Sequence, residues 1–178
     1  ETLHAVLPMH LQGWGWTCVF CTAVHGTSFA TMYRMVKDAG PLVIALKTAN
    51  NGAVVGVFSH VGLGLNERVG VAADGFVFSS TPRPPTGDDA PPPSSEHATS
   101  RVAIYKDAER NKYFLLPRSN RVQVGGGPTG PALFINEYFA TGATYACETF
   151  DSPPLIDDVD HGTFRITRAD IYACGRPN

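Results

Sequence analysis

Short runs of β-branched and aromatic residues, separated by turn residues, recur along this chain and restrict it to a mainly β fold. The clearest two runs span residues 42–47 and 53–58, and the segment between them carries Asn50-Asn51-Gly52, which is typical of a β-hairpin. Further runs span residues 75–79, 101–106, 112–116, 121–124 and 132–135, residues 142–150 alternate moderately, and residues 164–167 with 171–172 form one or two more. About eight short strands and one clear helix predict an α+β, mostly β fold, a two-layer antiparallel β sandwich with flanking helices.

The segment from residue 14 to residue 36 predicts one strand followed by one helix. Large apolar side chains occupy alternate positions in its first part, which indicates a strand with one buried face: Trp14, Trp16, Cys18 and Phe20. Thr27 or Ser28 can accept the free amide hydrogens at a helix start. The helix has one apolar face at helical spacing, made by Phe29, Met32, Tyr33 and Val36. We expect Gly40-Pro41 to end it.

The length and composition set the domain count and exclude some partners. A chain of 178 residues suffices for one domain, and we expect residues 1–178 to form it. Residues 81–100 are rich in Pro, Ser and Asp and offer almost nothing to bury, so we expect an exposed insertion there. The net charge of −2 provides no field for capturing nucleic acid. No apolar run reaches the roughly 18 residues of a membrane span. Because the chain opens at Glu1, we expect it to be part of a longer protein.

The four cysteines are Cys18, Cys21, Cys147 and Cys174, and their spacing is no disulfide framework for a chain of this length. We therefore expect reduced thiols in the cytosol. Cys18 and Cys21 spell C-x-x-C, but a redox pair needs its first cysteine at a helix start, and a zinc knuckle needs a second pair. This pair lies in the alternating segment, where a strand sends positions i and i+3 to opposite faces. Structural thiols are the expectation, and a redox or metal role is the alternative.

Other candidate motifs are weak. His25 with Ser28 could belong to a hydrolase site, but no Gly-x-Ser-x-Gly elbow is present, so we expect a histidine that bonds nearby backbone. The glycine-rich run 125–130 lacks the Gly-Lys-Ser/Thr of a phosphate loop, so we expect its glycines to permit turning or close backbone approach. We expect no catalytic residue, no metal and no cofactor.

Charge is unevenly distributed along the second half of the chain. Residues 101–121 are mainly basic, and residues 148–160 contain five acidic residues and no basic one. Two opposed patches could orient a protein partner, and solvated loops are the alternative.

Four motifs follow one another in a fixed order. The opening Leu-Pro-x-x-Leu-Gln-Gly-Trp-x-Trp contains Gln12, Gly13, Trp14 and Trp16, and the next motif contains His25, Gly26, Ser28, Tyr33 and Arg34. The glycine run supplies Gly125, Gly126 and Gly127, and the last motif supplies Cys147, Thr149 and Phe150. In order and spacing these motifs resemble the TLDc domain family of the oxidation-resistance proteins, over residues 7–175. Three places depart from the family pattern: Asp74 stands for its acidic residue, residues 107–111 replace its Trp-Thr-Gly-x-Asn segment, and Tyr172-Ala173 stands where a Trp is expected.

The resemblance implies a β sandwich of two antiparallel sheets with flanking helices. It also implies a non-enzymatic interaction domain linked to protection against oxidative stress. In some members such a domain binds the V1 sector of the vacuolar proton ATPase and regulates its assembly, which places it in the cytoplasm or at the cytosolic face of acidic organelles. The motif residues named above, together with Asp74, are then structural or partner-binding. The alternatives are a thiol-dependent antioxidant enzyme or small hydrolase, and a scaffold domain on another assembly such as a cytoskeletal one.

Overall fold

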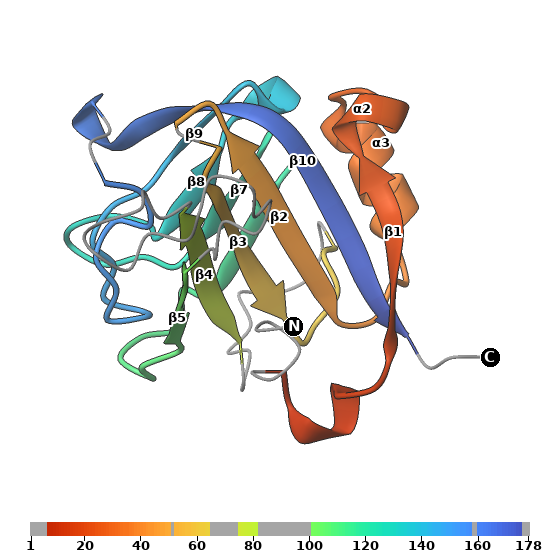
Figure 1. The fold of residues 1–178 in the computed structure, drawn as a ribbon, viewed down its shortest axis with the longest axis horizontal. Helices are drawn as coiled ribbons and strands as arrows, with labels where there is room; N and C mark the ends of the chain where they lie inside the picture. The colour runs from red at the N-terminus through yellow and green to blue at the C-terminus, as the bar shows by residue number, and fades with distance from the viewer. Residues whose placement is uncertain (1–6, 51, 65–74, 82–100, 158–159, 176–178) are drawn as a thin grey trace, which may run out of the picture.

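All the described strands but the first form one hydrogen-bonded path that is folded into two layers, and the first strand pairs with the last beside this path (Figure 1). The computed structural model describes residues 7–50, 52–64, 75–81, 101–157 and 160–175. Its strands are β1 (Gly15–Cys21), β2 (Leu42–Thr48), β3 (Val54–Ser59), β4 (Phe76–Thr81), β5 (Arg101–Lys106), β6 (Leu115–Arg118), β7 (Arg121–Val124), β8 (Leu133–Ile135), β9 (Thr141–Ala143) and β10 (Thr163–Gly175). Its helices are η1 (Met9–Leu11), α2 (Thr22–His25), α3 (Phe29–Val36), η2 (Glu137–Phe139) and η3 (Asp160–Gly162). All strand pairs are antiparallel, as predicted.

Strand β10 belongs to both layers. Its first three residues pair with β9, which continues through β8 and β7 to β6. Later residues of β10 pair with β2 on one edge and with β1 on the other. From β2 the sheet continues through β3 and β4 to β5. A register shift between Ile166 and Arg168 marks the place where the strand passes from one layer to the other. The 13-residue strand is therefore the corner of the sandwich.

The main core lies between the two layers. It contains side chains of β2, β3 and β4 from one sheet together with side chains of β6, β7 and β8 from the other. Helix α3 adds the four positions predicted for its apolar face: Phe29, Met32, Tyr33 and Val36. The predicted two-layer sandwich is confirmed.

A second apolar cluster covers the outer face of the β2–β3–β4 sheet. Val43, Phe58, Phe76 and Phe78 point to this side, and the N-terminal segment packs over them through Leu7 and Leu11. The sheet is therefore buried on both faces. Gly56 makes this packing possible, because a Cβ at that position would lie 2.5 Å from the Phe78 ring.

The register of β1 corrects the predicted alternation. Trp14 and Trp16 pack with the outer cluster, whereas Phe20 is fully buried in the main core and Cys18 is exposed. A bulge between Cys18 and Phe20 causes this difference, since the extra residue turns the end of the strand toward the other face.

Several boundaries also differ from prediction. Helix α3 ends at Val36, before Gly40-Pro41, and α2 was not predicted. The run 112–116 becomes a strand only from Leu115, the weak run 142–150 contributes only to β9, and residues 164–172 lie in one continuous strand. Residues 82–100 of the predicted insertion lie outside the described residues, and Thr81 and Arg101, which flank them, are paired neighbours in the sheet.

Candidate functional site

The glycine run and the Cys147 motif meet in the main core. Gly125 has a φ of 73°, and a Cβ there would lie 2.6 Å from Cys147 Sγ and 2.9 Å from the Phe150 ring. Gly126 and Gly127 would likewise bring a Cβ to 3.0 Å from Tyr113 and 2.8 Å from Glu148. These glycines therefore permit close packing, as predicted.

Thr149 joins these two motifs to residues 107–111. Its buried hydroxyl accepts a hydrogen bond from the Gly126 amide at 2.9 Å and donates to Asn111 Oδ1 at 2.9 Å. The Thr149 carbonyl accepts from the Ala108 amide at 2.8 Å. Thr149 thus satisfies polar groups from two other segments and joins three segments in all, which is the role of a structural hub.

The basic and acidic segments do not form two fully separate patches. Arg110 and Asp151 make an ion pair at 3.2 Å, and the hydrogen bonds of Thr149 hold their segments side by side. Both side chains of the pair are more than half exposed, so the pair contributes little to stability. The predicted opposed patches therefore partly neutralise each other.

The N-terminal motif covers the outer apolar cluster. Gln12 Nε2 donates to the Leu7 carbonyl at 3.0 Å, and Gly13 turns the chain with a φ of 94°. Trp14 and Trp16 are half-buried against the sheet, and the Trp16 ring meets that of Tyr172 edge to face at 6.2 Å. These positions anchor the segment to the sheet.

His25 and Ser28 are both engaged in local structure. His25 Nδ1 accepts a hydrogen bond from the Cys21 amide at 3.0 Å, and its ring stacks on Phe20. Ser28 caps α3, because its hydroxyl accepts from the Thr31 amide at 3.4 Å. The predicted backbone-bonded histidine is confirmed.

The rest of this motif fixes α2 and α3 in place. Gly26 ends α2 with a φ of 75°. Tyr33 donates its hydroxyl to the Arg118 carbonyl at 2.7 Å, which ties α3 to the end of β6, and Arg34 is exposed on the same helix. Burial raises the pKa of the Tyr33 phenol well above its ordinary value.

Two hollows open on the described surface. One, of about 500 Å³, is lined by residues 25–30, 119–120 and 137–138. The other, of about 550 Å³, is lined by residues 144–146, 154, 156–157 and 161–162 with Thr129. The first brings the predicted His25–Ser28 segment next to two turns that the sequence did not single out. No local signal predicts this, because its three segments are far apart in the chain.

The four cysteines are free thiols, and the surroundings of Cys18 and Cys174 disfavour the thiolate form. Cys18 is exposed, and Cys21, Cys147 and Cys174 are buried. Desolvation, followed by the charge of Asp170, raises the pKa of Cys18, and burial raises the pKa of Cys174 to about 11. Reactive cysteines need the opposite shift. Among the residues described, no three His, Cys, Asp or Glu side chains are placed to hold a metal ion.

Two further observations concern individual predictions. In the part of the chain that the structure covers, no helix has the length and apolar character needed to cross a membrane. Asp74 lies outside the described residues, so its role stays a prediction.

The chain is similar to known proteins along its whole length. The model of the TLDc domain family matches residues 1–175. Oxidation resistance protein 1 of Homo sapiens is 25% identical over 97% of this chain, GTPase-activating protein skywalker of Drosophila melanogaster is 26% identical over 96%, and nuclear receptor coactivator 7 of Gallus gallus is 23% identical over 92%. The aligned region is 17%, 28% and 17% of the length of these three relatives. The order of its motifs, its two-layer β sandwich and the match over residues 1–175 show that this chain belongs to the TLDc domain family.

Proposed function

We propose that this chain is a non-enzymatic protein-interaction domain linked to oxidative-stress protection, that it binds the V1 sector of the vacuolar proton ATPase, and that it regulates assembly of that enzyme. It would act in the cytoplasm, reaching the surface of acidic organelles through its partner. Membership of the TLDc family and the name of its relative oxidation resistance protein 1 support the link to oxidation. The V1 sector follows from the family resemblance.

One observation carries the choice of an interaction domain over an enzyme. The histidine and cysteine side chains considered as catalytic candidates already make hydrogen bonds within the fold. His25 Nδ1 accepts a hydrogen bond from the Cys21 amide, and the buried Cys147 Sγ lies 3.6 Å from the Gly126 carbonyl oxygen. The raised pKa of the exposed Cys18 also opposes thiolate formation at neutral pH. We therefore assign the function of this domain to contacts that its surface makes with a partner.

Direct binding tests the proposal. The chain is titrated against purified V1 sector, and ATP hydrolysis and reassembly with the membrane sector are followed in parallel. We expect a saturable complex and a change in the assembled fraction. A titration without binding would refute the V1 assignment.

A thiol variant separates an interaction domain from an antioxidant enzyme. We expect Cys18→Ser to bind V1 as the parent chain does, and we expect Cys18 in the parent chain to alkylate at neutral pH no faster than free cysteine. Rapid alkylation, or peroxide consumption that Cys18→Ser abolishes, would support the enzyme instead.

A further inference from the structure

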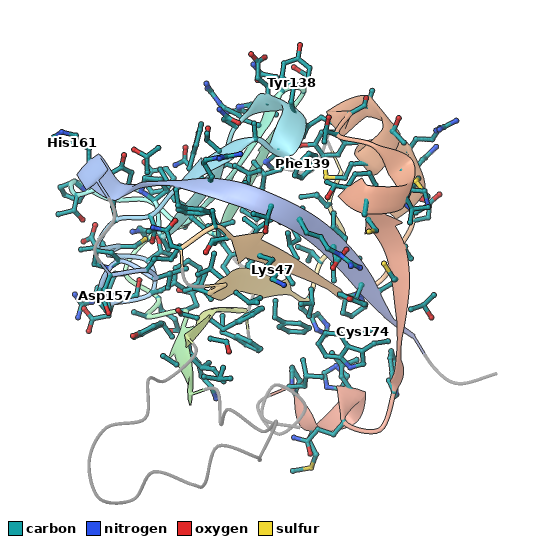
Figure 2. The ribbon with its side chains drawn as sticks, turned by 45° about the horizontal axis from the view of Figure 1, so that its top comes forward. Lys47, Tyr138, Phe139, Asp157, His161 and Cys174 are labelled. Carbon is teal, nitrogen blue, oxygen red and sulfur yellow. The ribbon has the colours of Figure 1, made fainter. Side chains whose placement is uncertain are left out.

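Tyr138 occupies an unusual place at the turn between β8 and β9. Its backbone has φ 64° and ψ 9°, a left-handed conformation that bulky residues rarely adopt, and its side chain is 64% exposed. The turn is closed by hydrogen bonds between Asn136 and Thr141. Figure 2 shows Tyr138 extending outward from the turn, whereas the neighbouring Phe139 lies on the side that faces α2 and α3.

Packing offsets the backbone strain of Phe139 and leaves that of Tyr138 without compensation. Phe139, with a φ of 52°, is buried and stacks on Phe29 with ring centroids 4.4 Å apart. The Tyr138 ring is largely exposed and stacks on no aromatic ring of the described residues. Gly or Asn would meet the backbone requirement at lower cost. Strain retained on an exposed aromatic side chain is a feature of binding sites, where Tyr is a frequent anchor.

A second locally destabilising feature, a pair of like charges, lies next to the same hollow. Arg118 and Arg121 are directly opposite each other in the register of the β6–β7 hairpin, and both are exposed. Like charges at opposed positions destabilise a strand pair. Among the described residues neither guanidinium forms an ion pair. The two residues between them, 119 and 120, line the same 500 Å³ hollow as Tyr138.

The hollow between these features suits a polar chain with negative charge. Its walls supply hydroxyl and amide groups from Thr27, Ser119 and Asn120, which can hydrogen-bond carboxylates. Glu137 is the anionic residue of its lining, and the two opposed arginines directly flank its lining residues Ser119 and Asn120 in the chain. The local balance is positive, although the whole chain has a net charge of −2.

We propose that this Tyr138 surface, made by Tyr138, the hollow beside it, Arg118 and Arg121, binds an acidic polypeptide segment of a protein partner. Tyr138 is the anchor that the segment buries, and the two arginines pair with its carboxylates. This assigns a face and a partner chemistry to the proposed function, and it rests on that function only where V1 is used as the probe.

Two substitutions have opposite expected effects on stability and binding. Tyr138→Asn relieves the backbone strain of the left-handed conformation, so we expect Tm to rise by about 2–4 °C. We expect the affinity for V1 to fall about tenfold or more, because the aromatic anchor is lost. Arg121→Glu converts the opposed pair from like to unlike charge, so we expect unchanged or higher thermal stability and weaker binding. A purely structural role for either residue would lower stability and binding together.

Matched controls lie elsewhere on the molecule. Lys47→Glu makes the same change of charge as Arg121→Glu. Lys47 is also opposite a like charge, Arg168 of β10, but it lies on β2 away from Tyr138 (Figure 2). Tyr113→Asn removes another tyrosine that is 52% exposed and does not line the hollow. We expect both controls to bind V1 as the parent chain does.

A second probe keeps the inference testable if V1 does not bind. Titration of the isotope-labelled chain with poly-L-glutamate should shift backbone amide NMR signals at residues 25–30, 118–121 and 137–138, and Arg118→Glu/Arg121→Glu should abolish these shifts. Shifts centred elsewhere, equal shifts with RNA, or no shifts at all would overturn the inference. V1 binding that survives Tyr138→Asn and Arg121→Glu would overturn it while leaving the proposed function intact.

Discussion

Replacing Gly125 by Ala tests why the glycine run of this family is needed. With a φ of 73°, the position costs an L-residue roughly 1–2 kcal/mol in backbone conformation. The added Cβ would also lie 2.6 Å from Cys147 Sγ and 2.9 Å from Phe150, distances that force buried groups to move. Overpacking of this kind costs about 1–3 kcal/mol. The free energy of unfolding should therefore fall by about 2–5 kcal/mol, out of the roughly 5–15 kcal/mol that is typical of a domain.

Gly52→Ala is the matched control for the backbone term. Gly52 has a similar φ of 67°, but no atom of the described residues lies within 4 Å of its added Cβ. Its free energy of unfolding should fall by about 1–2 kcal/mol, and the restriction that alanine places on the unfolded chain is common to both variants. Urea unfolding followed by tryptophan fluorescence measures both losses.

The difference between the two variants isolates the packing term. We expect Gly125→Ala to lose about 1–3 kcal/mol more than Gly52→Ala, which corresponds to about 2–4 °C in Tm for each kcal/mol. Cys147→Ala makes room beside the new methyl group, so the double variant Gly125→Ala/Cys147→Ala should lose less than the sum of the two single changes. Equal losses in Gly52→Ala and Gly125→Ala, or strict additivity in the double variant, would refute the close-packing explanation.

Three other substitutions probe the packing around the site. Phe139→Ala removes the ring that stacks on Phe29 and should cost about 3–5 kcal/mol in urea unfolding, whereas a loss below 1 kcal/mol would show that this ring does not hold the turn. Thr149→Val removes the acceptor of the Gly126 amide and should cost about 1–3 kcal/mol, and a neutral result would argue against its role as a hub. Burial raises the pKa of Cys174 to about 11, so its contribution to stability is complete below the ordinary thiol range and is lost as pH rises from about 9 toward 11. Stability of the parent chain should thus fall more steeply between about pH 9 and pH 11 than that of Cys174→Ala, and parallel curves would contradict this.

Elements defined by neighbouring residues were predictable from the sequence. The hairpin of β2 and β3 follows from two β-rich runs beside Asn50-Asn51-Gly52, and its register is maintained from Leu42 to Lys47. Helix α3 follows from its apolar spacing and from the Ser28 cap. In both cases the deciding interactions lie within a few residues of each other, so the local pattern and the fold agree.

Elements shaped by distant contacts were not predictable. Strand β10 changes sheets near Ile166, so polar residues such as Arg165 and Arg168 interrupt its apolar pattern. The bulge before Phe20 has no signal in an alternating sequence. The same holds for the Tyr138 surface, because nothing in the residue type at position 138 predicts a left-handed backbone next to a segment more than 100 residues earlier in the chain.

The corner strand β10 also determines when this domain can fold during its own synthesis. Both sheets need β10, and β1, which is made first, has β10 as its strand partner. A ribosome that has released residues up to 157 has delivered two groups of strands with nothing to join them. The apolar side chains of the nascent chain, including the two tryptophans, therefore cannot reach their final packing until Gly175 emerges from the exit tunnel. Chaperones that act late in translation should accordingly matter more for this domain than for a fold that completes its sheets in sequence order.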